Sequence, residues 1–200
     1  SSLTSSAGNG NNSITFNTLS EGNYANCTIK VFDIASNESI PLSVKTFVVD
    51  TTPPSINSVS SSNSDGIFRD VYDNITIQLT FNETVLVDNL TIGNVNTYPS
   101  ILLETGSTDR NAYYSSGNNS TVLSFIYTLQ LADNTSDLNY KNINSLSLNS
   151  STIKDLVSFD ANLLLPETNS THSLASNKGL VINTYLQFGS SKIGKSVFSK

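Results

Sequence analysis

Two stretches in which apolar and polar residues alternate constrain the fold of this chain most strongly. In "NITIQLTF", residues 74–81, every second residue is apolar: Ile75, Ile77, Leu79 and Phe81. In "TVLSFIYTLQL", residues 121–131, the same period recurs at Leu123, Phe125, Tyr127, Leu129 and Leu131. Successive side chains of a strand point to opposite faces, so both stretches predict half-buried antiparallel strands with these apolar residues turned inward.

Weaker strand signals recur along the rest of the chain. Each is a short apolar stretch bounded by Gly, Asn, Asp or Pro, which favour turns. These stretches lie at 56–61, 84–88, 100–104, 145–148, 162–165 and 179–184. Only "TIKDLV" and "ADNTSDLNY" are expected to hold a helical turn. Many short strands separated by polar turns predict an all-β fold, a β-sandwich of antiparallel strands.

Composition narrows the range of functions. Charged residues make up only 13% of the chain, the net charge is -6 and the isoelectric point is near 4.5. The lysines are scattered singly, so no basic patch can neutralise phosphates and a nucleic-acid partner is not expected. No run of about 20 apolar residues is present, so no membrane span is expected in this segment.

The stretch "VVDTTPPSI", residues 48–56, predicts a boundary between domains. A proline fixes its own φ, lacks an N–H and pushes the preceding residue into extended conformations, so Pro53 and Pro54 predict a stiff joint and not a strand. We therefore expect a first module over residues 1–52 and a second, longer module over 53–184. Residues 185–200 are expected to form a tail or the start of a further module.

The first module is expected to be incomplete. "NCTIKVFD" and "IPLSVKTFVVD" predict a hairpin in which Cys27, Ile29 and Val31 share one face, with Cys27 as a small buried residue. A two-sheet sandwich of the immunoglobulin type takes about 100 residues, roughly twice the length before the joint. Its opening strands would be lost or supplied by chain outside this sequence.

Several stretches resemble the immunoglobulin-like repeats of large bacterial surface proteins. "LSEGNYANCTIKVFDIASNESIPLSVKTFVVDTTPPSI" resembles the end of one such repeat, and "SDGIFRDVYDNITIQLTFNETV" with "VLSFIYTLQLADNTSDLNY" resembles a second. The resemblance implies tandem Ig-like β-sandwiches of Greek-key type in an extracellular adhesin or surface filament. It also implies a structural role without enzymatic activity, with neighbouring modules of the same kind as partners.

The resemblance is not complete. Such repeats have a loop with the sequence "DAAGN". The corresponding segments here are "DIASN" at 33–37 and "DLVSFD" at 155–160, and both lack the glycine. The two modules also share little sequence with each other, so they do not form an array of identical repeats.

Few residues in the chain could carry catalysis. His172 in "NSTHSLASN" is the only histidine, and Cys27 is the only cysteine. A nucleophilic site needs a base beside its nucleophile, and a structural zinc site needs several histidines or cysteines. We expect no enzymatic activity, and an exposed loop position for His172.

Calcium is the one cofactor that the sequence leaves open. Ca²⁺ binds six to eight oxygens from carboxylates, amides, carbonyls and water. The candidate ligands are Asp50 at the joint, Asp65, Asp70 and Asp73 in the loop "SDGIFRDVYDN", and Glu83 in "FNET". The alternative is that these acids cap turns without an ion.

Two other functions remain as alternatives at this point. The segment "TDRNAYYSSGNN", residues 108–119, is interpreted as an exposed loop that could bind a glycan or a protein. Tyr113 and Tyr114 would stack on a sugar, while Asp109, Arg110 and Asn111 would hydrogen-bond it. The incomplete first module would instead suit a filament subunit assembled by strand complementation.

Glycosylation is a further possibility, because N-x-S/T triplets are frequent. The acceptors considered are Asn26, Asn37, Asn74, Asn82, Asn89, Asn118, Asn134, Asn149 and Asn169. A chain so rich in Asn, Ser and Thr also produces such triplets by chance.

Overall fold

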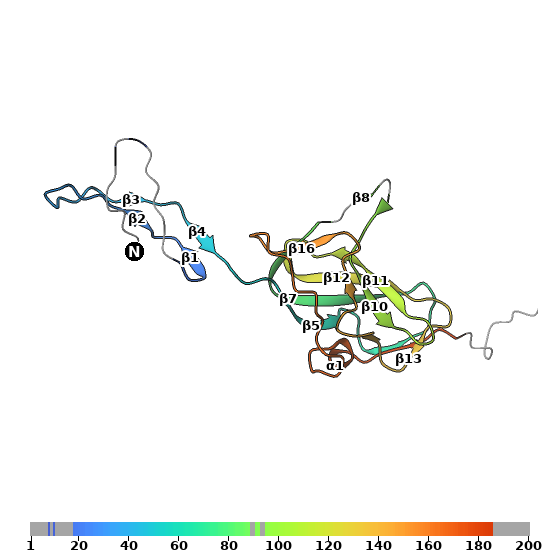
Figure 1. Ribbon diagram of the computed structural model, residues 1–200. Helices are drawn as coiled ribbons and strands as arrows, with labels where there is room; N and C mark the ends of the chain where they lie inside the picture. Colours follow the sequence, from blue (N-terminus) through green and yellow to red (C-terminus); the bar gives the residue numbers. More distant parts are fainter. Residues whose placement is uncertain (1–7, 9, 11–17, 89–90, 93–94, 186–200) are drawn as a thin grey trace, which may run out of the picture. The chain divides into compact units, whose positions relative to one another are not determined.

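The computed structural model divides into two compact units, Ser1–Thr52 and Pro53–Lys200 (Figure 1). It describes residues 8, 10, 18–88, 91, 92 and 95–185. The expected tail therefore lies almost entirely outside the described residues. The boundary between the units falls at the first of the two adjacent prolines, and each unit is described by itself below.

The N-terminal unit consists of two short antiparallel pairs. Strand β1 (Gly22–Tyr24) pairs with β4 (Phe47–Val49), and β2 (Thr28–Ile29) pairs with β3 (Leu42–Ser43). The rings of Tyr24 and Phe47 stack with their centroids 5.2 Å apart. The predicted pairing of the two stretches is confirmed, although each contributes only two or three residues to a strand.

The prediction that one face of this unit is buried is wrong. None of the described residues between 18 and 52 is buried, and Cys27 is only half-buried. Val31 is 54% exposed, because β2 ends at Ile29 and the chain beyond it lies outside any named strand. Strands this short cannot bury a face unless a second layer covers them.

The C-terminal unit is built on an eight-stranded antiparallel sheet. Its path runs β14-β10-β11-β12-β7-β16, while β5 also pairs with β7 and β15 also pairs with β10. The strands are β5 (Ile56–Ser61), β7 (Asn74–Asp88), β10 (Ser100–Glu104), β11 (Arg110–Ser116), β12 (Ser120–Thr128), β14 (Asn139–Tyr140), β15 (Leu146–Ser147) and β16 (Thr152–Lys154).

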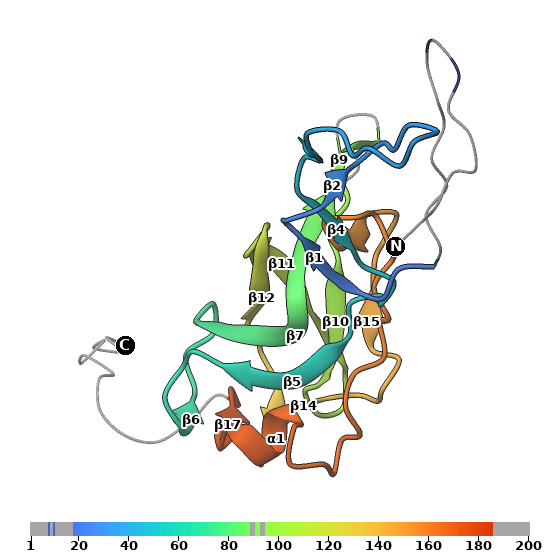
Figure 2. The ribbon, with the colours of Figure 1, turned by 90° about the vertical axis from the view of Figure 1, so that its left-hand side faces the viewer.

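A smaller sheet and a short helix complete this unit (Figure 2). Strand β17 (Leu180–Asn183) pairs with β13 (Asn134–Thr135) and, in parallel, with β6 (Gly66–Phe68). Helix α1 (Leu174–Asn177) packs against β5. Strand β8 (Thr91–Ile92) pairs antiparallel with β9 (Val95–Asn96). The fold is thus nearly all-β, with mostly antiparallel sheets consistent with the predicted sandwich.

Segment 172–177 covers β5. The Val59 amide donates a hydrogen bond of 2.9 Å to the His172 carbonyl, and Asn177 donates through Nδ2 to the Val59 carbonyl at 2.9 Å. The side chain of Ser173 caps the helix by accepting a hydrogen bond from the Ser176 amide. These bonds satisfy backbone groups of β5 that would otherwise form an open sheet edge.

The core lies on the face predicted from β7 and β12. All four apolar residues predicted to face inward on 74–81 are at most 2% exposed, and the predicted strand at 84–88 continues the same β7. From β12 and the residue just after it, Leu123, Phe125, Tyr127 and Leu129 are fully buried. The prediction that Leu131 faces inward is wrong. Leu131 is 52% exposed, because β12 ends at Thr128 and the chain turns at Ala132 with φ 72°.

Several shorter elements also differ from the predictions. Residues 162–165 form no strand, and the expected helical turns at "TIKDLV" and "ADNTSDLNY" contain β16, β13 and β14 instead. Strand β6 and helix α1 were not predicted. Strands of two or three residues carry too little periodicity to be read from sequence, because distant partners determine them.

Within the described part of the chain, we find no helix long and apolar enough to cross a membrane.

The contrast between Leu129 and Leu131 provides a test of the core. Leu129→Ala is expected to lower the free energy of unfolding by about 2–5 kcal/mol, because it removes a fully buried side chain. Leu131→Ala is the matched control and should cost less than about 1 kcal/mol at its exposed position. Urea unfolding of both variants measures the difference, and equal costs would contradict the observed end of β12.

Candidate functional site

A buried aspartate joins β11, β12 and the turn before β13. Asp133 accepts hydrogen bonds from Arg110 Nε at 2.9 Å, from the Tyr127 hydroxyl at 2.5 Å and from the Gln130 amide at 2.8 Å. The Asp133 side chain is 2% exposed and that of Arg110 is 25% exposed. Each Asp133 oxygen has a donor and the charge is neutralised by Arg110, so this network stabilises the fold.

The phenol of Tyr127 belongs to the same network. Burial raises the pKa of Tyr127, and the hydrogen bond to Asp133 raises it further because the carboxylate disfavours a phenolate. The group stays protonated and donates permanently, which suits a structural role better than acid–base chemistry.

The residues predicted to bind a glycan do not form one loop. Residues 110–116 are strand β11 inside the large sheet, so the loop interpretation of 108–119 is wrong. Arg110 turns to Asp133, and the Tyr114 ring packs edge-on against Phe125 at a centroid distance of 5.9 Å. Tyr113, in contrast, is 52% exposed. Alternation along a strand separates these two tyrosines, so they cannot stack together on one sugar.

The flanking members of that set have other neighbours. Asp109 lies 3.5 Å from the Lys141 ammonium, which also pairs with Glu104. These contacts raise the pKa of Lys141, with the Glu104 hydrogen bond as the main cause. Asn111 lines an open cleft of about 380 Å³ whose other polar walls are Asn and Ser side chains.

Three of the predicted calcium ligands in the C-terminal unit do not form a site together. Among the described residues, the carboxylates of Asp65, Asp70 and Asp73 do not converge as one ligand set. Asp65 accepts a hydrogen bond from the Gly179 amide at 3.2 Å, and the Asp70 carbonyl accepts one from the Asp73 amide at 3.1 Å. The Asp65 carboxylate thus bonds a backbone amide far away in the sequence, and residues 70–73 form a hydrogen-bonded backbone turn.

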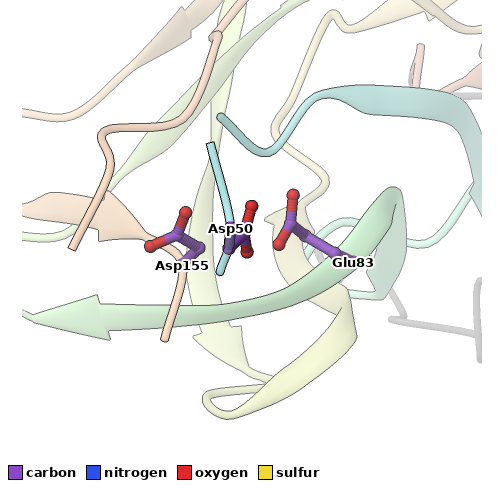
Figure 3. A group of neighbouring side chains, drawn as sticks. All are labelled: Asp50, Glu83 and Asp155. Atoms are coloured by element: carbon purple, nitrogen blue, oxygen red, sulfur yellow. The ribbon is translucent and has the colours of Figure 1, made fainter. Parts of the chain in front are cut away.

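Glu83 has a different acidic neighbour, Asp155. Carboxylate oxygens of the two residues lie within 4.8 Å of each other. Figure 3 shows the Glu83 side chain extending from β7 toward the segment that holds Asp155, which directly follows β16. Asp50, also drawn, belongs to the N-terminal unit, where its carboxylate accepts a hydrogen bond from the Thr52 amide at 3.1 Å.

The pairing of β16 with β7 brings Glu83 and Asp155 together. On β7, Glu83 has the same odd parity as the buried Phe81 and Val85. On β16 and beyond, Asp155 has the parity of the buried Ile153. Since β16 pairs antiparallel with β7 and Ile153 lies opposite Val87, Asp155 continues the buried side of β16 beside the stretch of β7 that holds Glu83, where the register between β7 and β12 shifts.

The loop after Asp155 closes around one oxygen of its carboxylate. Oδ1 accepts hydrogen bonds from the Val157 amide at 2.9 Å and from the Phe159 amide at 2.8 Å. The Asp155 amide in turn donates to the Phe159 carbonyl at 3.1 Å, and Ser158 has φ 81°. This turn orients the carboxylate, and the two amides occupy the hydrogen-bonding capacity of Oδ1.

The other oxygen, Oδ2, is buried and has no hydrogen-bond partner among the described residues. Asp155 is 1% exposed, and no lysine or arginine of the described chain forms an ion pair with it. At an effective dielectric constant of 20, two unit negative charges about 5 Å apart repel by about 3 kcal/mol. The arrangement of Asp155 and Glu83 is therefore suited to a positively charged ligand.

Sequence reasoning selected Glu83 and missed Asp155. The expected helical turn at "TIKDLV" obscured the alternation of Ser151, Ile153 and Asp155, which are all buried. That alternation was the available signal, since an acid at a core-facing strand position requires a partner.

The remaining candidates have simple environments. His172 is exposed, as expected, and its backbone carbonyl bonds β5. Of the glycosylation candidates, Asn149 donates through Nδ2 to the Tyr98 carbonyl and to Ser100 Oγ at 2.8 and 2.9 Å. A glycan is attached at that nitrogen, so modification of Asn149 would disturb both bonds. Asn89 lies outside the described residues.

No family model, no curated protein and no solved structure matches this chain in the comparisons with known proteins.

The Asp133 network predicts a large loss of stability on neutralisation. Asp133→Asn is expected to cost about 3 kcal/mol, because Arg110 is left partly buried without its counter-charge. The control is Asp160→Asn, which breaks the exposed pair with Lys154 and should cost less than about 1 kcal/mol. Denaturant unfolding compares the two, and a similar small cost for both would contradict the structural role of Asp133.

Tyr140 predicts a loss of stability in alkali. Burial raises the pKa of Tyr140 to about 12 from 10.0. Between these pH values the unfolded chain has lost the proton while the folded chain keeps it, so stability falls as pH rises, by about 1.4 kcal/mol per pH unit for one group. Tyr140→Phe should make the decline in unfolding free energy above pH 10 shallower, whereas Tyr113→Phe at the exposed position serves as control. An unchanged slope in Tyr140→Phe would exclude this contribution.

Proposed function

We propose that this chain is a non-enzymatic structural segment of an extracellular or cell-surface protein. In this proposal its units are Ig-like β-sandwiches of Greek-key type, arranged in tandem and joined by a stiff Pro-Pro connection. The resemblance of the joint and the flanking strands to bacterial surface repeats supports the proposal, as does the division of the chain at this joint. Its neighbours would be modules of the same kind.

The bonding on each side of the joint carries the proposal. On the N-terminal side, Thr52 donates through Oγ1 to Glu21 at 2.7 Å, inside the first unit. On the C-terminal side, Pro54 is buried and its carbonyl accepts a hydrogen bond from the Asn162 amide at 2.8 Å, inside the second unit. Each unit thus anchors the chain up to the joint, and little besides the exposed Pro53 is left to rotate.

The residue after the joint is anchored as well. The Ser55 amide donates to Asn82 Oδ1 at 2.7 Å, and the Asn82 amide donates to the Ser55 carbonyl at 3.0 Å. Asn82 follows the four core residues of β7, so the connection is tied directly to the strand that organises the second unit. Such attachment suits a spacer that transmits orientation along a chain of modules.

The buried polar groups support a structural role over catalysis. Asp133, Arg110 and Tyr127 are bonded to one another and to backbone, and an active site instead aims such groups at a substrate. An enzymatic role has no comparable observation in its favour.

Stiffness of the joint is the property to test. Cys27 is the chain's only cysteine, so a spin label there and a second on Ser107→Cys, in an exposed turn, report the distance distribution between the units. Pro53→Gly should broaden that distribution markedly, because glycine frees φ. Pro41→Gly, at an exposed proline within the first unit, is the matched control and should leave it unchanged.

Two outcomes would count against the spacer. A distribution already broad in the unmodified chain would mean that the joint does not limit bending. Equal widths before and after Pro53→Gly would mean that the prolines are not the cause of the stiffness.

A second candidate function is assembly by strand addition. The N-terminal unit exposes a set of large apolar side chains: Phe32, Ile34, Ile40, Leu42 and Val48. Strands β2 and β3 pair only with each other among the described residues, so each offers an open edge to a second copy of the chain. Light scattering across a concentration series tests this candidate, since a monomer at the highest concentration would argue against it.

A further inference from the structure

Asp155 presents an electrostatic problem that the described residues leave unsolved. Its Oδ2 is buried without a hydrogen-bond partner, while its Oδ1 is held by the amides of Val157 and Phe159. A buried carboxylate is stable only when it is paired with a charge, fully hydrogen-bonded or bound to a metal. In the described part of the chain, Oδ2 of Asp155 is the only buried side-chain nitrogen or oxygen atom without a hydrogen-bond partner.

The position of Glu83 indicates which of these three ways of stabilising the Asp155 carboxylate applies. A second negative carboxylate within 4.8 Å of Asp155 excludes simple ion pairing between the two. One Ca²⁺ ion holds oxygens at about 2.3–2.6 Å, so two of its ligand oxygens lie at most about 5 Å apart. The observed separation is within that limit, and a divalent cation would convert the repulsion into two attractions.

We propose that Asp155 and Glu83 bind a calcium ion at the junction of β7 and β16. The two carboxylates neutralise its charge, and water completes the coordination shell. Asp155 also lines an open cleft of about 460 Å³ together with Asp88 and Asn118, which gives a hydrated ion a polar approach. Few protein ligands and partial hydration correspond to weak binding, in the range of about 10⁻⁴–10⁻³ M typical of extracellular modules.

This site differs from the calcium set expected from sequence. It retains Glu83, adds Asp155 and does not use Asp65, Asp70 or Asp73. The inference rests on the Asp155–Glu83 pair alone and does not depend on the spacer function proposed above.

Thermal unfolding of the full chain tests the proposal. Addition of CaCl₂ to about ten times the dissociation constant, compared with a chelator, should raise the midpoint by about 3 °C or more, because the ion binds only the folded state. Glu83→Gln and Asp155→Asn should each abolish most of this shift. Asparagine keeps an Oδ1 that can accept the Val157 and Phe159 bonds, so the loop should remain folded.

Asp70→Asn is the matched control, since Asp70 is an exposed acid of the same unit outside the proposed site. It should keep the full calcium shift. Titration calorimetry with CaCl₂ on the unmodified chain should show one ion bound per molecule, and this measurement stands even if a variant is poorly folded.

Three results would overturn the proposal. The first is an unmodified chain whose midpoint and calorimetric trace do not respond to calcium. The second is a calcium shift that survives both Glu83→Gln and Asp155→Asn. The third is a chain whose stability in chelator Asp155→Asn leaves unchanged, with no calcium response in either form, which would show that the buried acid carries a proton instead of an ion.

Discussion

Burial of one face of β7 is the interaction on which the C-terminal unit depends. This strand of 15 residues pairs with β12, β5 and β16, and its odd-numbered positions supply Ile75, Ile77, Leu79, Phe81, Val85 and Val87 to the core. A single strand cannot offset the entropy of ordering its backbone, so its partners must cover the same face. Segment 172–177 and the β6–β17–β13 sheet therefore belong to one cooperative unit with β7.

The two buried acids, Asp133 and Asp155, differ in the partners that surround them. Asp133 lies where a cation and two other donors converge, so it is satisfied within the fold. Asp155 lies where a second acid approaches, so its free oxygen needs a ligand from solution. The first arrangement makes the unit more specific in its packing, and the second gives it sensitivity to its ionic surroundings.

The sequence predicted the fold best in the long stretches where apolar and polar residues alternate. The core faces of 74–81 and of 123–129 follow directly from alternation. It failed where long-range pairing decides the structure: β11 was interpreted as a loop, β16 as a helical turn, and Leu131 as a core residue. Asp155, one of the two acids of the candidate cation site, was missed for the same reason. It lies near Glu83 only because β16 pairs with β7.

The N-terminal unit shows what happens without such a strand, since its described residues bury no side chain. Native-state hydrogen exchange measures this contrast most directly, because amides in a cooperative core exchange only through global unfolding. The account predicts that amides of residues 75–81 are the slowest in the chain, while those of 22–49 exchange faster by orders of magnitude. Equal protection of the two segments would contradict the central role of β7.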